Sequence, residues 1–323
     1  MSNRIVGKAG MLTAIAVFSA MAAAAYMLAP GNGFAESPGL CLPQADRWPM
    51  APLLSWGINY LVLGICAMML ANIDRKFNLV QGTDLLLPAA FLIMTASCPW
   101  DVQRLCSGSV MALANIASLW MLFGCSERRD NTHRLFAIAS FLSLGSAIQP
   151  AFLLMIPVYA AGAVLMKIMG VREAAAFLCG LAAPYLSLLG LGIVSPQDFS
   201  FVWNAGQTDF GSLPVDVFAV ALCAGFTILW SSAAGFSNLL RLLKSNVETR
   251  RHNTVIMLLG LAAAAGCLFN FSNLTVYLPT LCVAAAVQLS QGCSPAGSRV
   301  PPAVPLMLMA VYIASFVLIT GFL

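Results

Sequence analysis

The chain alternates long apolar runs with short polar connections. A bilayer core about 30 Å thick is crossed by roughly 20 helical residues, so each long run without charge is a candidate transmembrane helix. The third, fifth and sixth runs are short for a full crossing, and we expect these helices to be tilted, broken or partly re-entrant. The predicted fold is all-α, a polytopic membrane bundle of about 11 transmembrane helices. The runs lie near residues 10–29, 52–72, 84–98, 105–125, 134–149, 150–167, 174–194, 214–234, 254–270, 273–291 and 302–322.

Basic residues fall almost entirely on one side of this alternation. With the N-terminus inside, fourteen of the sixteen Lys and Arg residues lie in inner connections, and only Arg47 and Arg104 lie outside. Cytoplasmic connections of membrane proteins carry such an excess of Lys and Arg. The pattern therefore predicts an N-in, C-out, multi-pass membrane protein. A miscounted helix before the last connection would scatter the charges over both faces, so the split also supports the number of runs.

The chain is expected to form a single integral-membrane domain over residues 1–323. Residues 1–29 form an N-terminal anchor helix or a secretory signal, because Arg4 and Lys8 precede an apolar run long enough to span the membrane. Helices 2–7 occupy residues 52–194, and helices 8–11 occupy residues 214–323. Between them, residues 195–213 form an external loop that is rich in aromatic residues and lacks cations, which suits a segment lying on the outer headgroups.

Composition excludes several function classes. Hydrophobic residues make up 60% of the chain and charged residues 9%, and the net charge of +4 comes from the inner connections rather than from a basic domain. Nucleic-acid binding therefore has no support. The connections leave no room for a soluble catalytic domain, and neither a Walker-type nor a Rossmann-type pattern occurs. ATP-driven chemistry within this chain is not expected.

Cysteine and histidine give no metal-binding pattern. The ten cysteines include no CxxC pair, and most lie in apolar runs, where cysteine acts as a small hydrophobic residue. Cys41, Cys98 and Cys106 lie outside, so one disulfide could form there. His133 and His252 lie in basic inner connections without metal-ligand spacing, and both are predicted to be solvated loop residues.

The candidate chemistry lies in two predicted outer connections. Asp46 with Arg47 precedes Trp48 in the first, and Asp101 with Arg104 forms a charged turn between the third and fourth runs. An outer carboxylate could act as a general base or hold a divalent cation, and arginines bind phosphate through bidentate donation. These residues together suggest a site for a lipid-linked phosphate. The competing interpretation is that they form ordinary ion pairs of loops.

Polar residues inside the runs are sparse, and no ionisable residue is predicted at mid-depth. Proton- and ion-coupled transporters usually need such a residue or a broken helix that binds an ion. A carrier for a neutral or lipidic solute would instead need a polar cavity at mid-depth. Asn59, Asn115 and Gln149 are its candidate lining residues.

A set of apolar and turn-forming motifs extends over most of residues 55 to 290. The motifs are Asn72–Leu79, Leu86–Phe91, the Pro99 turn, the helix ending at Gly124, Leu142–Pro150, Val171–Glu173, Gly180–Tyr185 and Arg250–Arg251. Together they resemble those of a family of polytopic inner-membrane proteins of Bacteroidota that has no assigned activity. The resemblance implies a location in a bacterial inner (cytoplasmic) membrane.

More distantly, the short third run, its outer turn and the tight hairpin at Pro150 look like the membrane core of C-type glycosyltransferases. Those enzymes use polyprenyl-phosphate sugars and an acidic residue in the first external loop. The resemblance implies that Asp46 matches that acid, with Glu36 as the second choice. The chain lacks a clear paired-acid motif there and lacks the periplasmic domain that many such enzymes carry.

Three functions follow as hypotheses. In the leading one, the protein handles or transfers a polyprenyl-phosphate-linked sugar at the outer face, with Asp46 catalytic and with Arg47, Arg104 and Asp101 at the phosphate. No cofactor is predicted, although the site could hold a divalent cation. The second is a non-catalytic scaffold that binds other envelope membrane proteins. The third is the neutral or lipidic carrier. Membrane lipids are partners in all three, and nucleic acid in none.

Overall fold

The structure is a computed structural model that describes residues 2–28, 39–80, 85–125, 131–198, 215–242, 247–293 and 303–322. These ranges contain twelve α-helices and four short 3-10 turns, and no strand. The α-helices are α1 (Ser2–Leu28), α2 (Pro52–Phe77), α3 (Leu86–Ala96), α4 (Pro99–Gln103), α5 (Ser107–Gly124), α6 (Thr132–Ile148), α7 (Ile156–Leu165), α8 (Val171–Gly190), α9 (Val215–Leu242), α10 (Val247–Phe269), α11 (Leu274–Gly292) and α12 (Ala303–Phe322); the 3-10 turns are η1 (Ala45–Arg47), η3 (Pro150–Met155), η4 (Pro196–Asp198) and η6 (Phe271–Asn273).

The predicted all-α class is confirmed, and each apolar run contains a helix. Within the ranges given above, eight helices are long and apolar enough to cross a membrane, so the chain is a multi-pass membrane protein by length and composition. The runs predicted to be short are short: α3 has 11 residues, α6 has 17, and the sixth run is divided between η3 and α7. The total of eleven crossings and the direction of insertion stay predictions.

Helix α11 forms the centre of the bundle. It packs against α3, α5, α9 and α10, and 94% of the residues in its apolar stretch are buried inside the protein. The run Ala284–Ala286 and the nearby valines are small enough to let several helices approach it at once. The flanking helices α8, α9 and α12 have a far smaller share of their residues buried than α11 does. Their apolar faces point outward, as those of helices at a lipid boundary do.

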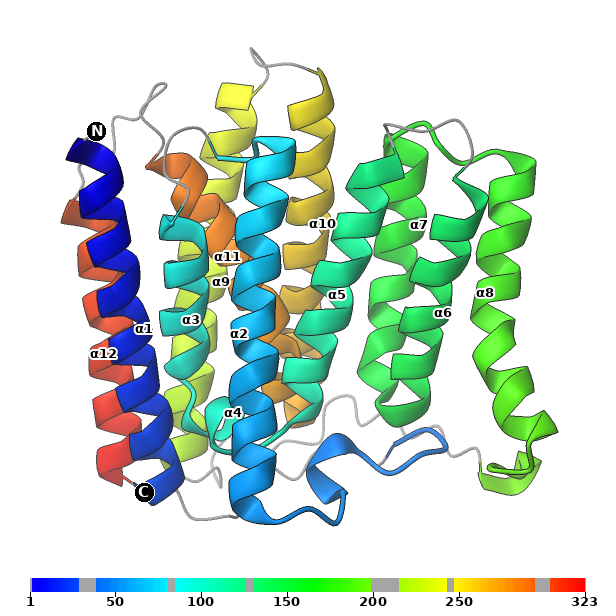
Figure 1. The fold of residues 1–323 in the computed structure, drawn as a ribbon, viewed down its shortest axis with the longest axis horizontal. Coiled ribbons are helices and arrows are strands. Elements are labelled where there is room, and N and C mark those ends of the chain that lie inside the picture. Colours follow the sequence, from blue (N-terminus) through cyan, green and yellow to red (C-terminus); the bar gives the residue numbers. More distant parts are fainter. Residues whose placement is uncertain are drawn as a thin grey trace.

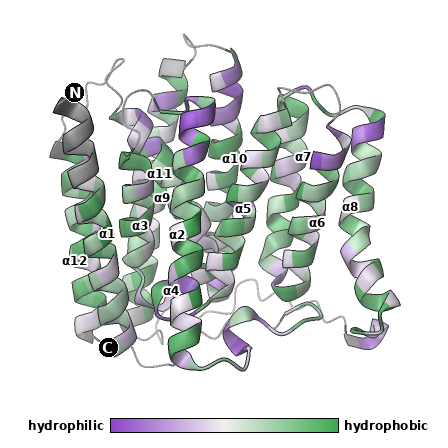
Figure 2. Ribbon diagram, in the orientation of Figure 1, coloured by the Kyte–Doolittle hydropathy of each residue, from purple (hydrophilic) through white to green (hydrophobic). Residues whose placement is uncertain are grey.

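The bundle has two polar ends. Figure 2 shows hydrophobic residues along the middle of the helices and hydrophilic residues gathered near both ends. The two chain termini lie at opposite ends of the bundle (Figure 1). We call the end that holds residues 39–50 and α4 the outer end, and the other the inner end, after the orientation predicted from the basic residues.

Helix α8 lies at the edge of the bundle and packs on α6. The contact is close because Gly180 has no side chain: a Cβ placed there would lie 2.4 Å from the backbone oxygen of Phe136. Two serines of α6 reinforce it, since Ser140 donates to the Gly180 oxygen at 3.2 Å and Ser143 to the Leu181 oxygen at 2.6 Å. Small residues and hydroxyl bonds of this kind hold helices together in lipid.

Some sequence predictions fall outside the described residues. They concern most of the aromatic loop, including Trp203, and the acidic residue Glu36. They also concern the basic residues Arg128, Arg129, Lys244 and Arg299 and the side chains of Arg4, Lys8 and Asp216.

Candidate functional site at the outer end

The first outer connection is fixed to the bundle on both sides of Asp46. The backbone N–H groups of Cys41 and Leu42 donate to the oxygen of Ala147 at the end of α6, at 3.2 and 3.0 Å. Gln44 then donates through Nε2 to Oε1 of Gln149 at 3.1 Å, and both side chains are buried. These contacts join segments about a hundred residues apart and hold the connection across the end of α6.

Gln149 extends this network into the centre of the bundle. Its Nε2 donates to Oδ1 of Asn273 at 3.0 Å, and Asn273 Nδ2 donates to Oδ1 of Asn270 at 3.1 Å. Asn270 immediately precedes η6, the turn that leads into α11, and Asn273 is the last residue of that turn. The chain of four amide side chains therefore ties residues 39–50 to the most buried helix. This role of Gln44 was not predicted, because a polar, uncharged side chain in a connection gives no signal in the sequence.

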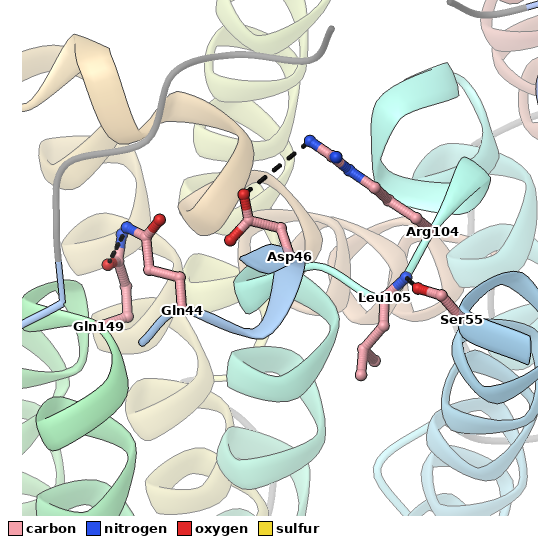
Figure 3. A network of polar contacts seen from close by, with 6 residues as sticks. All are labelled: Gln44, Asp46, Ser55, Arg104, Leu105 and Gln149. Atoms are coloured by element: carbon pink, nitrogen blue, oxygen red, sulfur yellow. Dashed lines mark hydrogen bonds and ion pairs between the residues drawn. The ribbon is translucent and has the colours of Figure 1, made fainter. Parts of the chain in front are cut away.

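Asp46 faces Arg104 across the outer end. Asp46 lies in η1, Arg104 follows α4, and Oδ2 of Asp46 lies 3.9 Å from Nη2 of Arg104 (Figure 3). The Arg104 side chain is 34% exposed and that of Asp46 is 14% exposed. The second carboxylate oxygen of Asp46, Oδ1, is buried and has no hydrogen-bond partner among the described residues. Burying such an oxygen costs about 1–3 kcal/mol, and more when it is charged.

The turn that carries Arg104 is held in place by hydrogen bonds, as the first outer connection is. The N–H of Leu105 donates to Oγ of Ser55 at 3.0 Å, which joins the residue after Arg104 to the first turn of α2 (Figure 3). Asn59, one turn further along α2, donates to the backbone oxygen of Asp101 at 2.8 Å. Both bonds come from α2, so the position of Arg104 depends on this helix.

Arg47 and Asp101, the other two residues predicted to lie at the phosphate, differ in exposure. Arg47 is exposed, beside Asp46 in η1. Asp101 is 1% exposed and lies in the first turn of α4, where the positive end of the helix favours an acid. The structure thus brings Asp46 and Arg104 together at the surface, with Arg47 next to them, and places Asp101 beneath the surface.

The outer cysteines are free thiols, so the disulfide considered from the sequence is not formed. Cys106 instead caps α5, because its Sγ accepts from the N–H of Ser109 at 3.4 Å. Among the described residues, no group of three His, Cys, Asp or Glu side chains could hold a metal ion. A divalent cation at Asp46 would therefore need oxygens from its ligand or from water.

The polar residues proposed to line a carrier cavity have structural partners. Asn59 and Gln149 make the bonds given above, and Asn115 donates to Oγ1 of Thr280 at 3.1 Å while it accepts from the hydroxyl of Tyr159. All three are fully buried. They join helices to one another, which does not favour a water-filled path at mid-depth in this conformation.

One prediction for the inner end is wrong. His252 was expected to be a solvated loop residue, but its side chain is only 2% exposed. Helix α10 begins at Val247, so His252 lies within its second turn and points among aromatic side chains. Its ring centroid is 4.3 Å from that of Phe123 and 5.5 Å from that of Phe77.

Comparison with known proteins identifies no relative: no family model, no curated protein and no solved structure matches the chain. The resemblances seen in the motifs, including that to a glycosyltransferase core, gain no support from these comparisons. The chain is, on its helices and composition, a polytopic helical membrane protein.

Proposed function

We propose that the protein binds a polyprenyl-phosphate-linked sugar at the outer face of the inner membrane, with Arg104 at the phosphate and Asp46 as the reacting carboxylate. The observation that carries the proposal is the buried Oδ1 of Asp46, which has no hydrogen-bond partner in the described part of the chain, beside the partly exposed Arg104. A carboxylate oxygen of this kind destabilises the fold, and such costs are typical of functional sites. The network that fixes both connections supports a preorganised site.

Arg104 is suited to phosphate because its contact with Asp46 is long and single. Guanidinium has five N–H donors, and among the described residues the 3.9 Å contact engages at most one of them. A phosphate carries more charge than one carboxylate oxygen and accepts two parallel bonds from arginine. We therefore expect the phosphate to replace Asp46 at Arg104, with the exposed Arg47 as a second cation.

Asp46 would then serve as the general base in transfer of the sugar, and it would not bind the phosphate. When the phosphate takes over Arg104, the carboxylate loses its counter-ion and is free to accept a proton. Proton transfer from an acceptor hydroxyl to Asp46 would activate that hydroxyl for attack on the sugar carbon bonded to phosphate. The polyprenyl phosphate leaves with the bonding electrons, and Arg104 stabilises its new negative charge.

The proposal predicts opposite effects for the two members of the pair. Arg104→Gln should weaken binding of polyprenyl phosphate about tenfold or more, because it removes a charge-assisted hydrogen bond. Asp46→Asn should leave binding equal or tighter, since it removes the competing carboxylate, and should abolish sugar transfer. Binding is measured by native mass spectrometry of the full chain in lipid nanodiscs, and transfer by the level of polyprenyl-linked precursors in cells.

Arg75→Gln is the matched control, since Arg75 is an exposed arginine at the inner end of α2. It should bind as the unchanged protein does. Equal binding by Arg104→Gln, or normal precursor levels in Asp46→Asn, would refute the proposal.

A non-catalytic scaffold is the second candidate, and the edge position of α8 favours it. Only 11% of the residues in the apolar stretch of α8 are buried, so most of the surface of this helix is open to lipid or to another protein. Gentle extraction and crosslinking from a position on α8 should then recover a partner in stoichiometric amount. Recovery of the chain alone would remove this candidate.

A further inference from the structure

The inner end holds a cavity of about 670 Å³ between four parts of the bundle. Its lining comes from the end of α5, the start of α6, the connection between α7 and α8 with the first turn of α8, and the first two turns of α10. A volume of this size suits a small ligand rather than a single ion. It lies at the end opposite Asp46 and Arg104, so it is independent of the site proposed above.

Two buried polar side chains that line the cavity lack hydrogen-bond partners among the described residues. His252 is 2% exposed and both of its ring nitrogens are unbonded, and Asn131 is 6% exposed with Oδ1 unbonded. The rings of Phe77 and Phe123 contact the imidazole and offer its nitrogens no hydrogen-bonding atom. Buried polar atoms in native proteins are nearly always bonded, so these two indicate a ligand with donors and acceptors of its own.

The cavity presents both signs of charge. Lys167 and Arg251 provide two cations, and Glu173 and Glu248 two carboxylates. Helices α6, α8 and α10 all begin at its wall, at Thr132, Val171 and Val247, so their N–H ends add partial positive charge. Burial raises the pKa of the nearby Cys125 thiol, against the opposing effect of Arg134, so that thiol adds no charge.

Lys167 occupies a backbone position that normally belongs to glycine. It follows α7 with φ of 58°, and two backbone bonds close the helix end around it: Lys167 N–H to the Val164 oxygen at 2.9 Å, and Ile168 N–H to the Ala163 oxygen at 3.1 Å. This is a Schellman end, whose left-handed residue is most often glycine. A lysine there strains the backbone, and strained residues cluster at binding sites.

From these observations we infer that the inner cavity binds a small zwitterion in which a phosphate is joined to an ammonium group. Arg251, Lys167 and the start of α6, whose first turn has no acidic residue, receive the phosphate, and Glu173 and Glu248, in the first turns of α8 and α10, receive the ammonium group. Phosphate is among the anions that helix N-termini bind. The same chemistry occurs in soluble phosphoethanolamine and in the headgroup of phosphatidylethanolamine, and the experiment separates the two sources.

The test titrates O-phosphoethanolamine into the full-length protein in nanodiscs made of phosphatidylglycerol alone. We expect it to bind at least about tenfold more tightly than inorganic phosphate or ethanolamine, because each of these fills only half of the site. Adding phosphatidylethanolamine to the nanodiscs should suppress this binding if the natural source is the lipid headgroup, and leave it unchanged if the source is soluble. Binding no tighter than that of inorganic phosphate would overturn the inference.

Two variants assign the binding to the cavity. Arg251→Gln and Lys167→Gly should each weaken binding about tenfold or more, whereas Arg250→Gln, which changes a neighbour outside the lining, should not. Lys167→Gly should unfold at the same or a higher temperature, because glycine relieves the left-handed strain. Weaker binding without loss of stability would show that Lys167 belongs to a ligand site and does not act through the fold alone. Unchanged binding by both variants would contradict the inference that the inner cavity binds the zwitterion.

Discussion

Replacement of Gln149 by leucine is expected to destabilise the protein by roughly 2–6 kcal/mol, because it leaves two buried hydrogen-bonding partners unsatisfied at about 1–3 kcal/mol each. Gln149 is fully buried and joins Gln44 to Asn273. Leucine has a similar volume, so the loss reflects hydrogen bonding rather than a cavity. The measurement is the free energy of unfolding in mixed micelles, followed by circular dichroism.

The same change should loosen the first outer connection. Without Gln149, Gln44 no longer ties residues 39–50 to α11, and Asp46 lies only two residues further on. We therefore expect Gln149→Leu to increase hydrogen exchange of this connection and to weaken binding of polyprenyl phosphate. Ser187→Ala is the control, since Ser187 is exposed and bonds only within its own helix, to the Ala183 oxygen. A Gln149→Leu protein as stable as Ser187→Ala would show that the network does not hold the outer end.

Replacement of Gly180 by alanine is expected to destabilise the contact between α6 and α8 by about 1–3 kcal/mol, the usual range for overpacking. The new methyl group would lie 2.4 Å from the Phe136 oxygen, and a backbone atom cannot turn aside as a side chain can. The helices must separate, which also weakens the bonds from Ser140 and Ser143.

The matched control is Gly64→Ala in α2, where no atom lies within 4 Å of the added methyl group. This change should be neutral or should stabilise the protein by up to about 1 kcal/mol, because alanine is the better helix former. The readouts are the free energy of unfolding and the rate at which a protease cleaves the connection between α7 and α8. Equal behaviour of the two variants would contradict the close packing of α8.

The fold was largely predictable because lipid imposes one rule on every run. Backbone groups in the bilayer must be bonded within the segment, so apolar length alone indicates a helix. The short third and sixth runs were recognisable for the same reason, and Pro150 marked where the fifth run ends and the sixth begins. Helix α4, in the outer turn between the third and fourth runs, was not expected, since five residues are too few to give a periodic pattern.

The site was only partly predictable. Charge in the outer connections led to Asp46 and Arg104, and the structure places them together, but no spacing in the sequence relates residues 58 positions apart. The network of Gln44 and Gln149 depends on tertiary packing and has no motif. His252 was misplaced because the beginning of α10 is basic and polar, which in a sequence looks like a connection, whereas the helix in fact begins at Val247.

The account depends most on which end of the bundle faces outward. Single cysteines at Trp48, whose side chain is 39% exposed at the outer end, and at Lys167, exposed at the inner end, should be treated in intact cells with a membrane-impermeant maleimide. The parent protein corrects for its own thiols. We expect Trp48→Cys to react at once and Lys167→Cys to react only after the membrane is permeabilised. Reaction of Lys167→Cys in intact cells, with Trp48→Cys silent until permeabilisation, would invert the orientation and contradict the proposed site.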